Sequence, residues 1–165
     1  MAARRVGKRL SMHMEYIYSN HAVGKFGIEY VFYRVLHMAP AGDMTTPTAM
    51  AQSFSLANMV PQNTQHNGGA WNKIEQDTRH YVKRAKGDVY VITGPVFSDA
   101  GPRIGANVVK VPTYLYKLVY DASTQRAWAH WQENREGEMV DRPISYQELV
   151  KRTGMEFLPR IAQPH

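Results

Sequence analysis

The feature that most constrains this fold is a series of β-branched and aromatic segments in the second half of the chain. Residues 88–97, 108–121 and 126–134 read DVYVITGPVF, VVKVPTYLYKLVYD and RAWAHWQEN. Residues of these types favour strands. The Gly94-Pro95 pair predicts a turn that interrupts the first segment. With the helices below, the pattern predicts an α+β domain with a mostly antiparallel sheet.

Two helices are predicted, one on each side of these strands in the chain. The first runs from about Asn67, with Gly87 expected at its C-cap. One face of this helix carries the positions that recur at helical spacing, which are Trp71, Ile74, Thr78, Tyr81, Val82 and Ala85. The other face carries Glu75 and Arg79 one turn apart, a spacing that predicts an ion pair.

The second helix has a signal at each end. Ser145 and Glu148 form a capping box before YQELVKRT, and Gly154 is placed to end the helix.

Upstream, residues 28–36 (IEYVFYRVL) are predicted to form a buried strand that ends at His37. The turn HMAPAGDMTTPT and the amide-rich FSLANMVPQNTQHNGG follow. Loops with many Asn and Gln side chains are usually held by hydrogen bonds to the backbone. We expect His66 to be an exposed loop histidine.

Composition removes several classes of function. A chain of 165 residues is expected to be a single domain. Without cysteine it has no thiolate nucleophile, disulfide or cysteine-ligated metal. The N-terminus begins basic but lacks a stretch typical of a secretion signal, and no run has the length of a membrane span. The net charge of +6 suits a polyanion, although a soluble protein with surplus Lys and Arg is as ordinary an explanation.

Three polar residues fit the cleavage of a phosphodiester bond at neutral pH. His37 titrates near neutrality and could activate water. Mg²⁺ retains most of its waters, so one amide oxygen from Asn67 can suffice to hold the ion. Glu75 could orient the waters bound to the ion without binding the ion itself. Each residue also has a structural explanation. His37 could be a turn histidine, Asn67 a helix cap and Glu75 half of a surface ion pair.

The ordered segments HMAPAGDM, FSLANMVPQ, NGGAWNKIEQDTR, VYVITGPVF, VKVPTYLYKLVYD and RTGMEFLP resemble the DNA/RNA non-specific endonucleases, the Serratia-type and endonuclease G-like nucleases. The resemblance covers about three quarters of the chain. It implies a ββα-metal (His-Me finger) motif and a Mg²⁺-dependent endonuclease that hydrolyses both DNA and RNA, with Mn²⁺ as a substitute ion. Residues 37–165 would form the nuclease core, and residues 1–36 match the family poorly.

The resemblance also implies roles for single residues. His37 would be the general base and Asn67 the direct metal ligand. Glu75 would hydrogen-bond the waters around the ion, and Arg79 would bind the phosphate region with Lys83 as a further substrate contact. The amides of Asn58 and Gln62 would support the site.

The segment before His37 departs from the family, which normally reads Asp-Arg-Gly-His. Arg34, Val35 and Leu36 stand in place of the first three residues. Either the protein is a diverged member, or its sequence is altered or truncated at the N-terminal end. The alternative function is therefore a catalytically impaired protein that only binds nucleic acid.

The resemblance leaves partners and compartment open. DNA and RNA are the expected substrates, and an inhibitor protein or a second copy of the chain could bind as well. Family members are mostly secreted, periplasmic or mitochondrial, so the localisation stays undetermined.

Overall fold

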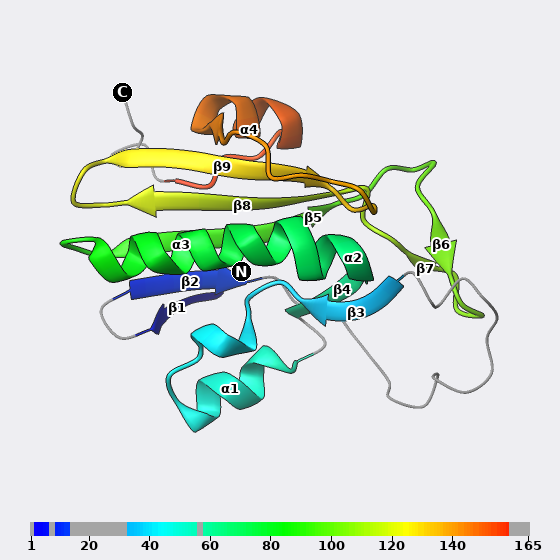
Figure 1. Ribbon diagram of the computed structural model, residues 1–165, viewed down its shortest axis with the longest axis horizontal. Helices are drawn as coiled ribbons and strands as arrows, with labels where there is room; N and C mark the ends of the chain where they lie inside the picture. The colour runs from blue at the N-terminus through cyan, green and yellow to red at the C-terminus, as the bar shows by residue number, and fades with distance from the viewer. Residues whose placement is uncertain (1, 7–8, 14–32, 56–57, 159–165) are drawn as a thin grey trace.

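A six-stranded sheet forms the centre of the protein, for which the computed structural model describes residues 2–6, 9–13, 33–55 and 58–158 (Figure 1). The strand order is β1-β2-β5-β8-β9-β10. Every neighbouring pair is antiparallel except β2 and β5, which are parallel. The strands are β1 (Ala2–Val6), β2 (Arg9–His13), β5 (Val89–Val96), β8 (Tyr114–Asp121), β9 (Arg126–Glu133) and β10 (Ile144–Ser145). The predicted fold class, α+β with a mostly antiparallel sheet, is confirmed.

The two faces of the sheet differ in chemistry, and strand β8 shows the difference most clearly. Successive side chains of a strand point to opposite faces. Tyr116, Leu118 and Tyr120 lie in one apolar cluster. Leu115 belongs to a separate cluster on the other side, and Lys117 contacts Trp71 and Glu75 on that side.

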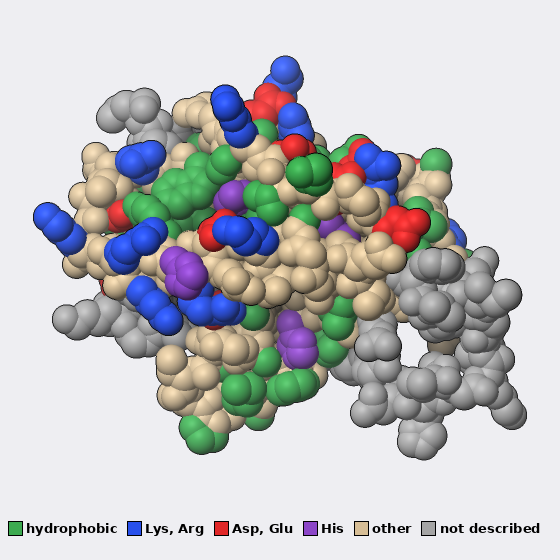
Figure 2. All heavy atoms as spheres, viewed as in Figure 1, with side chains coloured by type: hydrophobic (Ala, Val, Ile, Leu, Met, Phe, Trp, Pro, Cys, Tyr) green, Lys and Arg blue, Asp and Glu red, His purple; other side chains and the backbone are tan. Residues whose placement is uncertain are grey.

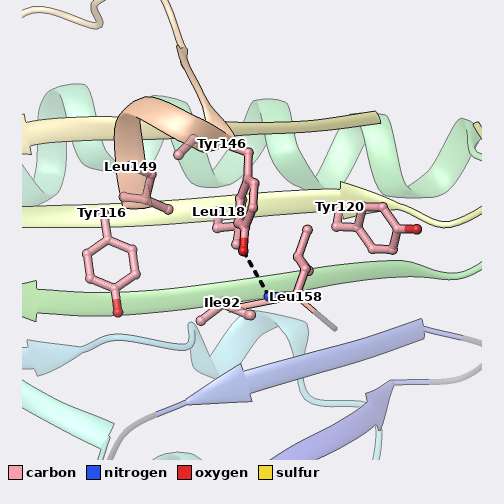
Figure 3. Close-up of a cluster of buried hydrophobic side chains, with 8 residues drawn as sticks. Ile92, Tyr116, Leu118, Tyr120, Tyr146, Leu149 and Leu158 are labelled. Carbon is pink, nitrogen blue, oxygen red and sulfur yellow. Dashed lines mark hydrogen bonds between the residues drawn. The ribbon is translucent and has the colours of Figure 1, made fainter. Parts of the chain in front are cut away.

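Helix α4 (Tyr146–Thr153) covers the first face. Tyr146 and Leu149 project from the helix onto Leu118 and its neighbours (Figure 3). The Tyr146 hydroxyl accepts hydrogen bonds from the backbone N–H groups of Phe157 and Leu158, both at 3.1 Å. The chain after the helix is thereby held against the same apolar cluster.

Both predicted ends of α4 are confirmed. The Ser145 hydroxyl accepts a hydrogen bond from the Glu148 N–H, and Gly154 follows the helix with a positive φ of 67°. The Glu148 carboxylate accepts a hydrogen bond from Arg152 one turn later. Of the two hydrogen bonds of a capping box, the one formed here is therefore that from the Glu148 N–H to the Ser145 hydroxyl.

Helix α3 (Asn72–Arg84) lies across the opposite face (Figure 1). The helical path starts earlier than predicted, with α2 (Thr64–His66) and the π-helix η5 (Asn67–Trp71). Asn63 is the N-cap, because its side chain accepts from the N–H groups of Gln65 and His66. The helix ends at Arg84 with Ala85 as its C-cap, so the prediction of Gly87 at this position is wrong.

A second, two-stranded sheet precedes these helices. Strand β3 (Tyr33–His37) pairs antiparallel with β4 (Met59–Asn63). Residues 28–32 of the predicted strand lie outside the described residues. Hairpin and helices together give the strand-strand-helix order of the expected ββα motif. Between the two strands stand the 3-10 helix η3 (Ala41–Asp43) and helix α1 (Pro47–Ser53).

Two strand predictions require correction. Strand β5 runs unbroken through Gly94 and Pro95, because Gly94 makes room for the ring of Tyr116: a Cβ at Gly94 would lie 2.3 Å from the Tyr116 hydroxyl. The segment 108–121 is two strands rather than one. Its first residues form β7 (Val109–Lys110), which pairs with β6 (Arg103–Ile104) in a separate hairpin.

Asn134 joins the ββα motif to the main sheet. Its buried side chain accepts a hydrogen bond from Asn63 N–H at 2.8 Å and donates to the carbonyls of Pro61 and Pro112 at 3.0 and 2.9 Å. These contacts attach the end of β4 to the segments flanking β8 and β9. None of the helices in the described part of the chain is long and apolar enough to cross a membrane.

Candidate active site

His37 is the last residue of β3, opposite Met59 in the hairpin. Its imidazole packs edge-on against Phe54, with 4.8 Å between ring centroids. The Nε2 atom is buried and has no hydrogen-bond partner. Burial lowers the pKa of His37 below its ordinary value. The ring is therefore neutral at physiological pH, the state that a base requires.

Two buried amides hold the backbone on either side of His37. Gln62 donates from Nε2 to the carbonyls of Leu36 and His37, each at 3.2 Å. Asn58 accepts from the Ala39 N–H at 2.8 Å and donates to the carbonyls of Ala39 and Ser53. The chain before and after His37 is thus fixed by side chains, as expected for an amide-rich segment.

Asn67 is the first residue of η5, where the helical turn is wide. Gly69 has the non-helical angles φ −100° and ψ −105°, which a residue without a Cβ adopts at low cost. The Asn67 side chain is half-buried. Single π-helical turns are frequent at functional sites, and Asn67 is the first residue of this one.

A cleft of about 350 Å³ lies between α3, the segment after His37 and the face of the sheet. Glu75, Arg79 and Lys83 line it from α3, and Asp43 from η3. Lys117 and Thr93 contribute from β8 and β5. Three of the predicted site residues therefore share one cavity.

The predicted ion pair between Glu75 and Arg79 is wrong. The Arg79 guanidinium instead donates to Asp43, with 2.5 Å between Nε and Oδ1. The Glu75 carboxylate lies 3.9 Å from the ammonium of Lys117, and its side chain is 13% exposed. Burial raises the pKa of Glu75, and the positive charge of Lys117 opposes this effect. Both partners come from distant parts of the chain, so helical spacing could not reveal them.

Asp43 and Lys117 are the site residues that the sequence did not single out. Asp43 lies near the end of the HMAPAGDM segment, and an acid that follows a histidine is the signal by which the sequence could have indicated it. Lys117 looks like the solvent-facing residue of a half-buried strand, yet it is only 2% exposed. The burial of Lys117 can be recognised only when the position of helix α3 over strand β8 is known.

His37 and Asn67 do not line this cleft. An apolar cluster connects them to it, because Met38, next to His37, packs with Trp71 and Ile74 of the helical segment. Ala39, two residues after His37, is itself a lining residue. His37, Asn67 and the cleft are thus parts of one packed unit, the ββα motif.

The face that carries α3 also carries Lys and Arg side chains spread along the helix (Figure 2). Lys73, Lys83 and Arg84 of α3 are exposed, and so is Lys86 just after the helix. Within the described residues, no group of three or more His, Asp or Glu side chains could hold a metal ion.

Comparison with known proteins supplies the family. The sequence profile of the DNA/RNA non-specific endonucleases matches residues 18–163. The chain is 34% identical over 145 residues to the mitochondrial nuclease EXOG of Xenopus laevis, covering 76% of this chain and 40% of that protein. It is 33% identical over 146 residues to human mitochondrial nuclease EXOG, covering 76% and 39%. The chain thus spans about two fifths of these curated relatives.

A solved structure agrees with the sequence comparisons. The EndoG/EndoGI complex, described as showing the mechanism of EndoG inhibition, contains a chain that superposes with a TM-score of 0.69 at 27% identity. The match covers 82% of this chain and 64% of the other. From profile, relatives and fold together, this chain belongs to the DNA/RNA non-specific endonuclease family.

Proposed function

We propose that the protein is a Mg²⁺-dependent endonuclease that hydrolyses phosphodiester bonds of DNA and RNA. The observation that carries the proposal is the shared cleft of Glu75, Arg79 and Lys83 beside the segment that begins at His37. The cleft combines two cations, Arg79 and Lys83, which could bind a phosphate, with the carboxylate of Glu75, which could hydrogen-bond water. Contacts to phosphate and sugar rather than base edges would leave little sequence preference.

His37 is the proposed general base. Because Nε2 is buried, we assign the reaction to Nδ1, which would take a proton from water as the water oxygen attacks phosphorus. The bond from phosphorus to the leaving oxygen then breaks, and that oxygen is protonated from solvent. The depressed pKa of His37 keeps the ring ready to accept a proton at neutral pH.

Asn67 and Glu75 fit a magnesium ion by the chemistry of their donor atoms. Mg²⁺ prefers oxygen ligands and is often held by one or two protein groups plus water. Asn67 would hold the ion through its amide oxygen, and Glu75 would orient the surrounding water as a hydrogen-bond acceptor. When bound, Mg²⁺, or Mn²⁺ in its place, supplies positive charge beside the phosphate oxygens.

Arg79 and Lys83 are the proposed phosphate contacts. Arg79 reaches the cleft already oriented by Asp43, so little side-chain entropy is lost when a phosphate binds. Lys83 lies one turn further along α3 and lines the same cavity.

Digestion of plasmid DNA and total RNA tests the proposal. Cleavage should require Mg²⁺, stop with EDTA and disappear in His37→Ala and Asn67→Ala. The matched controls His80→Ala and Asn72→Ala change exposed residues of the same types on α3 and should retain activity. Cleavage that persists in EDTA or in His37→Ala would refute the assigned chemistry.

The second candidate function is binding of nucleic acid without efficient cleavage. The sequence Arg34-Val35-Leu36 favours it, because neither Val35 nor Leu36 can bind a phosphate. Loss of a transition-state cation costs on the order of 10²–10³ in rate. Replacing these residues by Asp-Arg-Gly should raise the cleavage rate by that factor if they alone impair catalysis. An unchanged rate with DNA binding intact would place the defect elsewhere.

An inhibitor protein is a further proposed partner. It is supported by the similarity to EndoG in its complex with EndoGI. Titration of the active chain with such an inhibitor would test it, and undiminished cleavage would reject it.

A further inference from the structure

A lysine in the middle of a buried strand is unusual, and Lys117 is such a residue. Buried lysines are rare unless paired, because an ammonium loses its hydration when water is excluded. Lys117 is 2% exposed, in the central strand β8. The burial of Lys117 under the cleft therefore indicates a partner of opposite charge that the ammonium stabilises.

Three contacts fix the Lys117 ammonium. It donates to the hydroxyl of Thr93 at 2.9 Å, from the residue opposite in strand β5. It stands over the indole ring of Trp71, 5.2 Å from the centroid, at the range of a cation–π contact. The third contact is the Glu75 carboxylate at 3.9 Å.

Two other charged groups act on Glu75. The negative charge of Asp43 disfavours ionised Glu75, and the Arg79 guanidinium, which is paired with Asp43, favours it less strongly than Lys117 does. On the far side of Lys117, the neighbouring strand places His130 directly opposite. Burial and the nearby Lys117 lower the pKa of His130 to about 4, so this ring is neutral at pH 7.

We propose that Lys117 is a positioning residue that keeps Glu75 ionised and oriented toward the cleft. This inference rests on the proposed function, in which Glu75 orients water around the metal. Thr93 and Trp71 hold the ammonium in place, and the ammonium holds the carboxylate. Lys117 itself need not touch the reacting atoms.

Lys117→Met tests the inference, because it keeps the length and apolar stem of the side chain and removes only the charge. We expect the cleavage rate at neutral pH to fall about 10- to 100-fold, the usual loss when a residue supporting a metal site is removed. The acid limb of the pH–rate profile should move to higher pH, so part of the rate returns in alkaline buffer. Lys73→Met removes an exposed lysine of α3 and should change neither quantity.

A double-mutant cycle separates this role from a merely structural one. If Lys117 acts through Glu75, adding Lys117→Met to Glu75→Gln should lower the rate by less than about threefold. Multiplicative losses in the double variant would overturn the proposal.

A measurement without metal or substrate distinguishes failure of this inference from failure of the proposed function. In the metal-free chain, the carboxyl ¹³C signal of Glu75 should titrate at higher pH in Lys117→Met than in the unchanged protein or Lys73→Met. An unchanged midpoint would refute the role of Lys117, whether or not the chain cleaves DNA. If Lys117→Met does not fold, Thr93→Val, which frees the ammonium from its hydroxyl, should shift the midpoint in the same direction by less, and no shift would count against the proposal.

Discussion

Replacing Asn134 by alanine should loosen the attachment of the ββα motif to the sheet. The substitution removes three hydrogen bonds, with donor–acceptor distances of 2.8, 3.0 and 2.9 Å. It leaves the N–H of Asn63 and the carbonyls of Pro61 and Pro112 without these partners. A buried polar group that loses its partner costs about 1–3 kcal/mol. Carbonyls tolerate the loss better than N–H groups, so the sum should be about 3–5 kcal/mol.

Urea unfolding followed by circular dichroism measures this loss, with the exposed Asn72→Ala as a matched control that should change stability by less than about 0.5 kcal/mol. The total stability of a domain is about 5–15 kcal/mol, so the midpoint should fall visibly. Native-state hydrogen exchange should show the amides of β4 losing more protection than those of β8. A loss below about 1 kcal/mol in Asn134→Ala would show that the motif is held mainly by its apolar contacts.

Three further changes have expected outcomes. Asp43→Asn removes the carboxylate that orients Arg79, and we expect a several-fold higher KM for DNA, measured by steady-state cleavage; an unchanged KM would mean that Arg79 needs no orientation. His130 has a pKa of about 4 in the folded protein because of burial and Lys117, so the protein should be most stable above the ordinary pKa of about 6.5 and lose up to about 3 kcal/mol as pH falls toward 4. Urea unfolding of His130→Gln should show a shallower decline over that pH range, and an identical decline would contradict the assignment. Gly154→Ala should destabilise the protein by about 1 kcal/mol in thermal unfolding, because Gly154 adopts a positive φ at the end of α4; no change would mean that the helix end relaxes.

The elements that agree with the sequence-based predictions are those whose determining contacts are local. The ends of α4 follow from the hydroxyl of Ser145 and the conformational freedom of Gly154, both within one helical turn of their effect. The start of the central helix was misplaced because Asn63 lies within an amide-rich stretch in which several residues could serve as caps.

The candidate site was less predictable because its charges pair across the fold. Arg79 finds Asp43 and Glu75 finds Lys117, so the i,i+4 rule selected the wrong partners. His66 was expected in an exposed loop but is 2% exposed beside Trp71. Its sequence neighbours are polar, and only the packing of the motif on the sheet covers it.

The alternation of β8 divides the effects of mutation into two classes along one strand. Substitutions at Tyr116, Leu118 and Tyr120 strike the apolar cluster beneath α4 and should reduce the yield of folded protein. Lys117 stands between them in the chain but points to the cleft, where a change can leave folding intact and alter chemistry. A saturation library over this strand should therefore lower the yield of folded protein at Tyr116, Leu118 and Tyr120, and also at Leu115, which belongs to the apolar cluster on the other face. Lys117 is the position at which cleavage, if the proposed function holds, should change while the yield is kept.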